Sequence, residues 1–245
     1  MKRLFDLTAA ALGLVVLSPL LIPVAVLIWL QDHHSPFYIA TRAGRRERPF
    51  RMVKFRSMVV RADRTGVDST AGDDLRITAV GRFIRRTKLD EVPQLWNVLK
   101  GEMSLVGPRP NVERETLLYT PEEKRLLDVR PGITDLASIV FADEGEILRG
   151  SADPDLRYNQ VIRPWKSRLG LLYVDRMGPV GLDVRIMALT VLGAFRREQA
   201  LRETARMVRS LGGSEELAAV AARIEPLAAA APPGASDIVQ SRPVA

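Results

Sequence analysis

The hydrophobic pattern of the chain begins with an almost uncharged run from Ala9 to Leu30. As one helix this run would rise about 33 Å, roughly the thickness of the hydrocarbon core of a bilayer, which favours a membrane span. Ser18-Pro19 lies near its middle and Pro23 follows, and a proline inside a helix removes a backbone hydrogen bond. Both flanks are basic, which favours both ends on the cytoplasmic side. We therefore expect a re-entrant membrane helical hairpin over residues 1–35, broken at Ser18 and Pro19.

Two short segments after this run, 37–41 and 49–55, are rich in aromatic and β-branched residues. Such segments on either side of a basic, glycine-containing loop predict a small β-hairpin. His33 and His34, just before it, are expected to be surface residues rather than metal ligands, because adjacent side chains point in different directions.

Polar, turn-forming residues then fill segment 61–75, which predicts a loop. Asp63, within it, is a weak candidate to assist metal binding. Thr78 can cap a helix that turns Phe83 and Ile84 inward.

The C-terminal third is expected to be mainly helical. Residues 155–176 have a helical pattern that Pro164 interrupts, and the apolar segment 182–195 is too short to span a bilayer but suits an interfacial helix. Residues 196–227 read as a charged helical extension, and residues 228–245, rich in Ala, Pro and Ser, as a disordered tail.

These elements predict a mixed α/β, mostly helical fold. A cytoplasmic catalytic domain, residues 36–195, would carry amphipathic interfacial helices around a catalytic helix start.

Composition narrows the possible partners. The 245 residues include 36 Lys and Arg against 29 Asp and Glu, a formal charge of +7. Such a balance suits an anionic partner: membrane lipid, nucleic acid or a phosphorylated substrate. The absence of cysteine excludes disulfides, thiolate metal sites and cysteine nucleophiles.

Candidate chemistry centres on an adjacent acidic pair, Asp90 and Glu91, in a basic neighbourhood. Pro93 fits the first turn of a helix, so the pair would lie at a helix start, where the macrodipole favours negative charge. One carboxylate of such a pair can attack phosphorus while the other holds a divalent cation. The simpler alternative is that both acids cap a surface helix.

The run 85–110, which contains this pair and ends in Gly107-Pro108-Arg109-Pro110, closely resembles the bacterial sugar transferase family. These monotopic phosphoglycosyl transferases load a sugar phosphate onto polyprenyl phosphate. The resemblance implies that Asp90 attacks a nucleoside diphosphate sugar, with a UDP-sugar as the expected donor, forms an aspartyl-phosphosugar intermediate and releases UMP. Glu91 would hold Mg²⁺.

The resemblance also implies a cellular setting. The protein would sit at the bacterial inner (cytoplasmic) membrane with its catalytic domain facing the cytoplasm. It would catalyse the first membrane step of polysaccharide or glycoconjugate synthesis.

Four cationic residues are candidates to bind the phosphates of the donor. Lys54 and Arg56 share one face of a strand, and Arg109 lies between two prolines that restrict its backbone. Arg85 stands five residues before Asp90, where the family has a phosphate-binding arginine. The resemblance assigns all four to the diphosphate or nucleotide.

Downstream, residues 130–134 match a family turn, but Asp135 stands where glycine is usual and Ala137-Ser138 where alanine-glutamine is usual. This leaves the sugar unidentified. Asp135 and Glu144 either contact a sugar amine or hydroxyl or pair with a nearby arginine, Arg130 or Arg149, and we favour pairing.

Two other classes of protein share the basic composition. A membrane-tethered nucleic-acid-binding protein would need a reading element, and the sequence has no such element, so we expect no nucleic-acid partner. An inactive scaffold that keeps the fold is the third interpretation. The oligomeric state stays open, a homodimer included.

Overall fold

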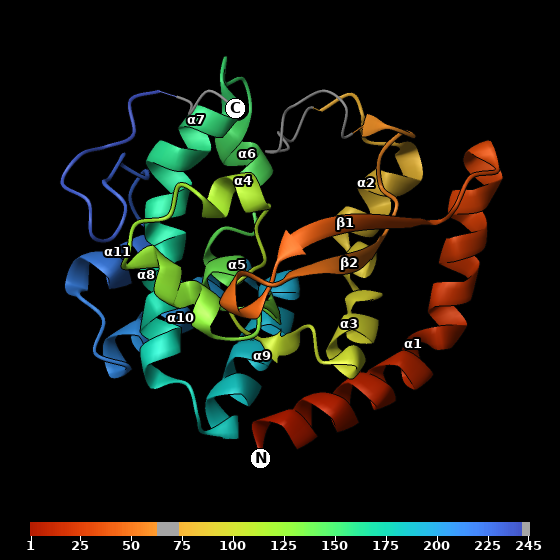
Figure 1. The fold of residues 1–245 in the computed structure, drawn as a ribbon, viewed down its shortest axis with the longest axis horizontal. Helices are drawn as coiled ribbons and strands as arrows, with labels where there is room; N and C mark the ends of the chain where they lie inside the picture. The colour runs from red at the N-terminus through yellow and green to blue at the C-terminus, as the bar shows by residue number, and fades with distance from the viewer. Residues whose placement is uncertain (63–73, 242–245) are drawn as a thin grey trace.

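The structure is a computed structural model that describes residues 1–62 and 74–241 (Figure 1). The mixed, mostly helical fold predicted from the sequence is confirmed. Part of the expected loop, including Asp63, lies outside the described residues.

The first elements, in which η marks a 3₁₀ turn, are α1 (Lys2–Asp32), β1 (Phe37–Ala43), η1 (Arg45–Glu47), β2 (Pro49–Phe55), α2 (Ala79–Arg86), η3 (Leu89–Glu91), α3 (Gln94–Lys100), β3 (Ser104–Val106), α4 (Glu113–Thr116) and η4 (Glu123–Asp128). The remaining elements are β4 (Gly132–Thr134), α5 (Leu136–Val140), α6 (Glu144–Leu148), α7 (Pro154–Arg157), the π-helical turn η5 (Tyr158–Ile162), α8 (Arg163–Arg176), α9 (Val180–Phe195), α10 (Arg197–Ser210) and α11 (Glu215–Ala222).

Helix α1 is one continuous helix with a bend in its middle (Figure 1). Pro19 and Pro23 lie inside it, and the Ser18 hydroxyl donates a hydrogen bond to the Val15 carbonyl at 2.8 Å. The two arms diverge in Figure 1, so the element is a bent helix rather than two arms folded against each other. Within the described residues, α1 alone is long and apolar enough to cross a membrane, judged by length and composition.

Polar contacts fix both ends of α1 to the rest of the chain. At the start, Lys2 forms an ion pair with Asp183 at 2.5 Å, and the Arg3 guanidinium donates to the Val98 and Leu99 carbonyls in the last turn of α3. At the end, Arg56 donates to both carboxylate oxygens of Asp32 at 2.5 and 2.6 Å. These contacts hold the concave side of the bend toward β2 and α3 (Figure 1).

Strands β1 and β2 form the predicted hairpin, antiparallel with Phe37 opposite Phe55. Strands β3 and β4 pair in parallel. At the edge of this second pair, a Cβ on Gly132 would lie 2.1 Å from the Gly107 nitrogen, so the two backbones meet at a distance that only glycine permits. This close approach fixes the turn that carries Arg109.

Helix α2 begins where the sequence predicts, with the Thr78 hydroxyl accepting a hydrogen bond from the Gly81 amide at 2.9 Å. Ile84 is fully buried as expected, but Phe83 is 58% exposed, so its predicted inward position is wrong. The inner face of α2 is occupied by Gly81, which meets the Ser57 backbone, and by Ile84, which packs against β2 and the second arm of α1. Phe83 lies on the outer side.

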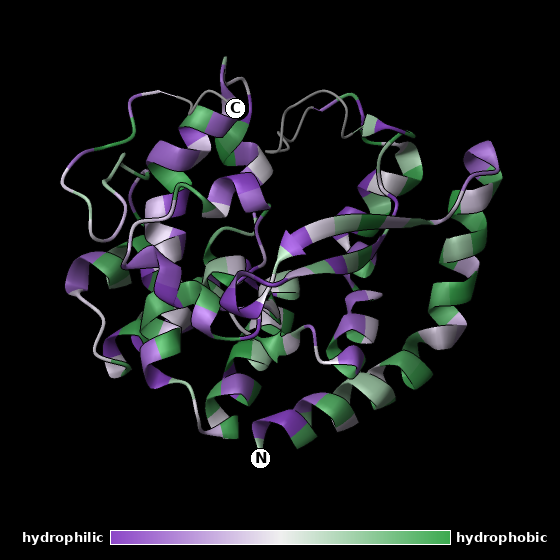
Figure 2. Ribbon diagram, viewed as in Figure 1, coloured by the Kyte–Doolittle hydropathy of each residue, from purple (hydrophilic) through white to green (hydrophobic). Residues whose placement is uncertain are grey.

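Residues 155–176, predicted to be helical, form most of α7, a π-helical turn and α8, with Pro164 in the first turn of α8. Helix α9 follows. Its exposed side carries Val184, Val191 and Phe195, three apolar residues spaced along one face. In Figure 2 apolar residues dominate both α1 and α9.

The C-terminal segment differs from the expected disordered tail. Between the end of α11 and Ser241 it has no helix or strand, but its backbone is bonded to α8 and the π-helical turn before it. The Trp165 indole donates to the Ala228 carbonyl at 3.2 Å, and the Arg168 guanidinium donates to the Ala231 carbonyl at 2.9 Å. Donors on α8 therefore order a segment whose own composition favours no regular structure.

Candidate active site

The acidic pair lies where the sequence predicts, immediately before a helix start. Asp90 and Glu91 form the 3₁₀ turn η3, and Pro93 is the N-cap of α3. Lys88 precedes the turn with a left-handed backbone, φ 59°, which redirects the chain out of α2. Both carboxylates thus occupy the N-terminal end of a helical path, where backbone dipoles favour negative charge.

Glu91 is held by two cations from distant parts of the chain. Arg109 donates to it with both arms of its guanidinium, at 2.5 Å to Oε1 and 2.9 Å to Oε2. Lys54 adds a contact to Oε1 at 3.3 Å. Burial alone would raise the pKa of Glu91, but the charges of Arg109 and Lys54 outweigh it and hold that pKa far below its usual range. Glu91 is therefore a firmly ionised carboxylate.

Asp90 is in a different electrostatic state from its neighbour. Its side chain is buried, and Oδ1 has no hydrogen-bond partner among the residues that the structure describes. Burial, followed by the charge of Glu91, raises the pKa of Asp90, and the nearby cations Lys54, Arg85 and Lys88 oppose that rise. The pair thus combines an ionised carboxylate that two cations hold with a buried carboxylate that has an unpartnered oxygen.

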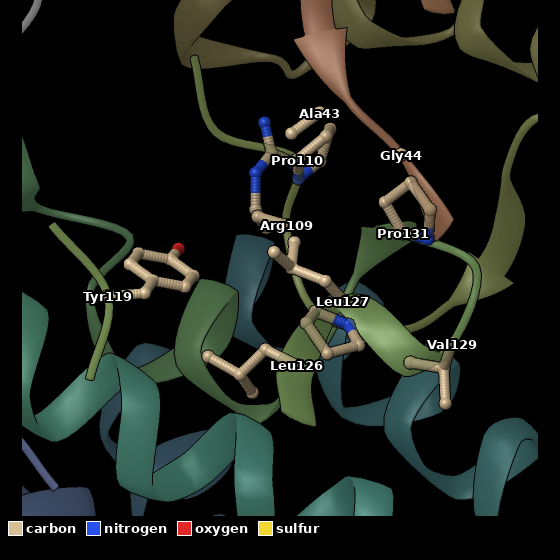
Figure 3. A pocket seen from close by; sticks show the side chains of 10 residues that line it. Ala43, Gly44, Arg109, Pro110, Tyr119, Leu126, Leu127, Val129 and Pro131 are labelled. Carbon is tan, nitrogen blue, oxygen red and sulfur yellow. The ribbon is translucent and has the colours of Figure 1, made fainter. Parts of the chain in front are cut away.

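Arg109 is presented by its turn toward the acidic pair. One guanidinium nitrogen also donates to the Ile133 carbonyl at 2.6 Å, which fixes the plane of the fork. Figure 3 shows the guanidinium pointing away from Leu126 and Val129, which line the small pocket behind the turn. That pocket holds only about 20 Å³, so it is a packing gap rather than a substrate site.

The other two predicted cations have different environments. The Arg85 guanidinium makes no hydrogen bond or ion pair with any described residue, and its charge is close enough to act on Asp90. Arg56 is turned away: besides Asp32 it donates to the carbonyls of Ser35 and His34. Lys54 and Arg56 therefore do not converge, because β2 ends at Phe55 and the strand alternation stops there.

Asp135 does not form the favoured pair with Arg130 or Arg149. It caps α5, where Oδ1 accepts hydrogen bonds from the amide and the hydroxyl of Ser138, at 2.6 and 2.5 Å. Burial raises the pKa of Asp135. Asp135 and Ser138, which both depart from the family pattern, therefore bind each other. The sequence analysis considered only a sugar contact or an arginine pair for Asp135.

The expected arginine partner of Glu144 is also wrong. Glu144 pairs with Lys166 of α8, and Arg149 pairs instead with Glu146, which lies one helical turn away. Helix α8 comes from a part of the chain that has no pattern linking it to α6, so no sequence pattern indicated the Lys166 contact.

Two residues near the acids were not singled out as candidates. Lys88 acts electrostatically on both Asp90 and Glu91. The sequence signal that could have identified Lys88 is its position in the basic cluster, two residues before Asp90. Gln94, the first residue of α3 and four residues after Asp90, is fully buried.

A divalent cation fits the acidic pair on the chemistry of the donors present. Mg²⁺ is usually held by one or two carboxylates together with substrate phosphates and water. Glu91 is ionised, and Asp90 has an unpartnered oxygen. The described residues contain no group of three or more His, Asp or Glu side chains arranged for a metal, so phosphate oxygens would complete the ligand set.

Comparison with known proteins identifies relatives over most of the chain. Residues 1–197 match the family model described as "Bacterial sugar transferase". The uncharacterised sugar transferase EpsL of Bacillus subtilis is 37% identical over 191 residues, which cover 78% of this chain and 85% of EpsL.

Two further relatives have names that state an activity. The UDP-glucose:undecaprenyl-phosphate glucose-1-phosphate transferase of Caulobacter vibrioides is 37% identical, over 68% of this chain and 65% of the relative. The UDP-N-acetylgalactosamine-undecaprenyl-phosphate N-acetylgalactosaminephosphotransferase of Aeromonas hydrophila is 36% identical over 75% of this chain. This chain spans 45% of the Aeromonas protein's length.

Proposed function

The chain belongs to the bacterial sugar transferase family, and we propose that it transfers a sugar 1-phosphate from a UDP-sugar to polyprenyl phosphate. The observation that carries the proposal is the state of Asp90. It is a buried carboxylate with an unpartnered oxygen, and its neighbour Glu91 is saturated by Arg109 and Lys54. Relatives named for UDP-sugars and undecaprenyl phosphate support the choice of donor and acceptor.

In the first proposed step, an Asp90 oxygen attacks the phosphorus next to the sugar. A bond forms between that oxygen and phosphorus, and the bond from phosphorus to the bridging oxygen breaks, so UMP leaves with the electron pair. Arg85 has no described partner and is available for a phosphate oxygen. Arg109 and Lys54 already point at the acidic pair and would meet the diphosphate there, where negative charge develops.

In the second step, a phosphate oxygen of polyprenyl phosphate attacks the same phosphorus, and the Asp90 carboxylate leaves. The product is a polyprenyl diphosphate sugar. A cavity of about 470 Å³ on the concave side of α1 supports this acceptor. Its lining is almost wholly apolar and includes Val53, next to Lys54, and Pro93, two residues after Glu91. An isoprenoid chain in this cavity would bring its phosphate to the acids.

Mg²⁺, held by Glu91 and the diphosphate, would supply positive charge to the leaving phosphate. Lys54 and Arg109 neutralise Glu91 in the structure. Binding of the donor diphosphate to Lys54 and Arg109 would free the Glu91 carboxylate to hold that ion.

We further propose that α1 enters one leaflet of the bacterial inner membrane and returns, which leaves the catalytic residues on the cytoplasmic side. Most of α1 is exposed and apolar, its bend contains Ser18 and Pro19, and α9 presents a second apolar face. Reporter tags at the two termini are therefore expected to be protected together from protease in intact cells. Protease removal of the N-terminal tag alone would show that α1 spans the membrane.

The function is tested by the first half-reaction without lipid acceptor. Purified enzyme mixed with a panel of UDP-sugars is expected to release one UMP per active site from the correct donor. Mass spectrometry of the quenched protein should then find a sugar phosphate on Asp90. Release of UMP only after polyprenyl phosphate is added, or an adduct on another side chain, would contradict the two-step mechanism.

A further inference from the structure

Buried polar atoms without a hydrogen-bond partner occur in two residues close together in the sequence, Asp90 and Gln94. In the described part of the chain, three buried side-chain nitrogen or oxygen atoms lack a hydrogen-bond partner: Oδ1 of Asp90, and Nε2 and Oε1 of Gln94. Gln94 is fully buried. A buried amide without partners is unfavourable for folding, and native structures rarely keep one without a functional or bridging role.

The backbone explains why these atoms are neighbours. Val92 and Pro93, which separate η3 from α3, both have right-handed helical torsions, so the path from Asp90 to Gln94 is helical throughout. Residues four apart on such a path, which starts in a 3₁₀ turn and continues into α3, lie about one to one and a third turns from each other. Asp90 lacks a donor, and Gln94 has an amide group able to supply one.

A second buried amide on the same helix provides the contrast. Asn97 lies one turn further along α3 and is also fully buried. Its oxygen accepts from the Val53 amide at 3.0 Å, and its nitrogen donates to the Arg51 carbonyl and to Glu102, both at 2.7 Å. Asn97 thus connects α3 to β2, whereas the Gln94 side-chain amide has no hydrogen-bond partner among the described residues.

We propose that Gln94 is a positioning residue for Asp90, donating a hydrogen bond from Nε2 to Oδ1, directly or through one water, in the donor-bound state. This contact leaves Oδ2 as the attacking atom and orients it toward the phosphorus. The inference rests on the proposed function, because it assigns Gln94 to the step in which Asp90 attacks.

The test replaces Gln94 by methionine, which is similar in length and unbranched but has no amide. Because the replaced atoms make no hydrogen bond, the melting temperature of Gln94→Met is expected to equal or exceed that of the wild type. The rate of UMP release at saturating UDP-sugar should fall by about 100-fold, the scale seen when one preorganised donor is removed. The KM for the donor should change by less than about threefold.

Two variants show whether the effect is local. Asn97→Leu removes an amide with three partners, and we expect it to lower the melting temperature. Gln199→Met makes the same substitution on the exposed side of α10, and we expect no change in turnover. A Gln94→Met enzyme with normal turnover, or one whose activity falls only with its folded fraction, would overturn the positioning role.

The same experiment separates this inference from the proposed function. If the wild type releases UMP and Asp90→Asn does not, the two-step mechanism stands, and normal turnover in Gln94→Met counts against Gln94 alone. If the wild type releases no UMP from any UDP-sugar, the proposed function itself fails, and the role assigned to Gln94 fails with it.

Discussion

Replacing Asp90 by asparagine is expected to abolish UMP release, with a loss of about 10⁴-fold or more in turnover. An amide oxygen is a far weaker nucleophile than a carboxylate, and enzymes that lose a covalent nucleophile show losses of this order. Asparagine has nearly the same shape, and Oδ1 of Asp90 has no hydrogen bond to lose in the described structure. The folded state should therefore survive, and the melting temperature should stay close to that of the wild type.

The control for Asp90→Asn is the same substitution at Asp175. That carboxylate pairs with Arg125 at the surface of α8, where an ion pair contributes little to stability. Asp175→Asn is expected to release UMP at the wild-type rate. If Asp90→Asn released UMP normally in the same assay, Asp90 would not be the nucleophile.

The sequence predicted the backbone positions of the acidic pair and of Arg109 better than it predicted their side-chain contacts. Asp90, Glu91 and Arg109 belong to one run of 26 residues, and local rules for a helix start and a proline-flanked turn placed them correctly. Lys54 reaches Glu91 from the β-hairpin, a contact between segments 37 residues apart. The family resemblance assigned Lys54 to the donor diphosphate, and no sequence pattern indicated its contact with Glu91.

Arg56 shows where local reasoning failed. Strand alternation placed Arg56 on the same face as Lys54, but the strand ends one residue earlier, and Asp32 at the end of α1 binds the guanidinium. The predicted arginine partners of Asp135 and Glu144 were wrong for a related reason. A charged residue has several possible partners in a sequence, and the chain folding in three dimensions decides which one it meets.

For the fold as well, local elements were predicted and long-range contacts were not. Periodicity and turn residues identified the hairpin, α2 and the interrupted helix around Pro164, because each is governed by neighbours in sequence. The tail after α11 was assigned to disorder by its composition, yet side chains of α8 bind its carbonyls. Such long-range contacts have no signature in the segment itself.

Replacing Arg109 by lysine is expected to lower kcat/KM for the UDP-sugar by about 100-fold, and replacing it by alanine by about 1,000-fold. Arginine residues that stabilise charge in phosphoryl transfer contribute effects of this size or larger. Arg109 uses a planar fork, with two contacts to Glu91 and one to the Ile133 carbonyl. Lysine keeps the positive charge but offers a single point of contact, so it cannot hold two oxygens in one plane.

Two control variants distinguish an effect of the Arg109 guanidinium on catalysis from an effect on stability. Arg163→Lys disrupts a similar two-armed pair with Glu123, buried between η4 and α8 outside the acidic site. It is expected to lower the melting temperature, while the folded enzyme keeps normal kcat/KM. Arg46→Lys, on the exposed loop of the hairpin, should change neither quantity. If Arg109→Lys lost stability as Arg163→Lys does but retained its kcat/KM, Arg109 would serve only to neutralise Glu91, and the diphosphate would have to be bound by other cations.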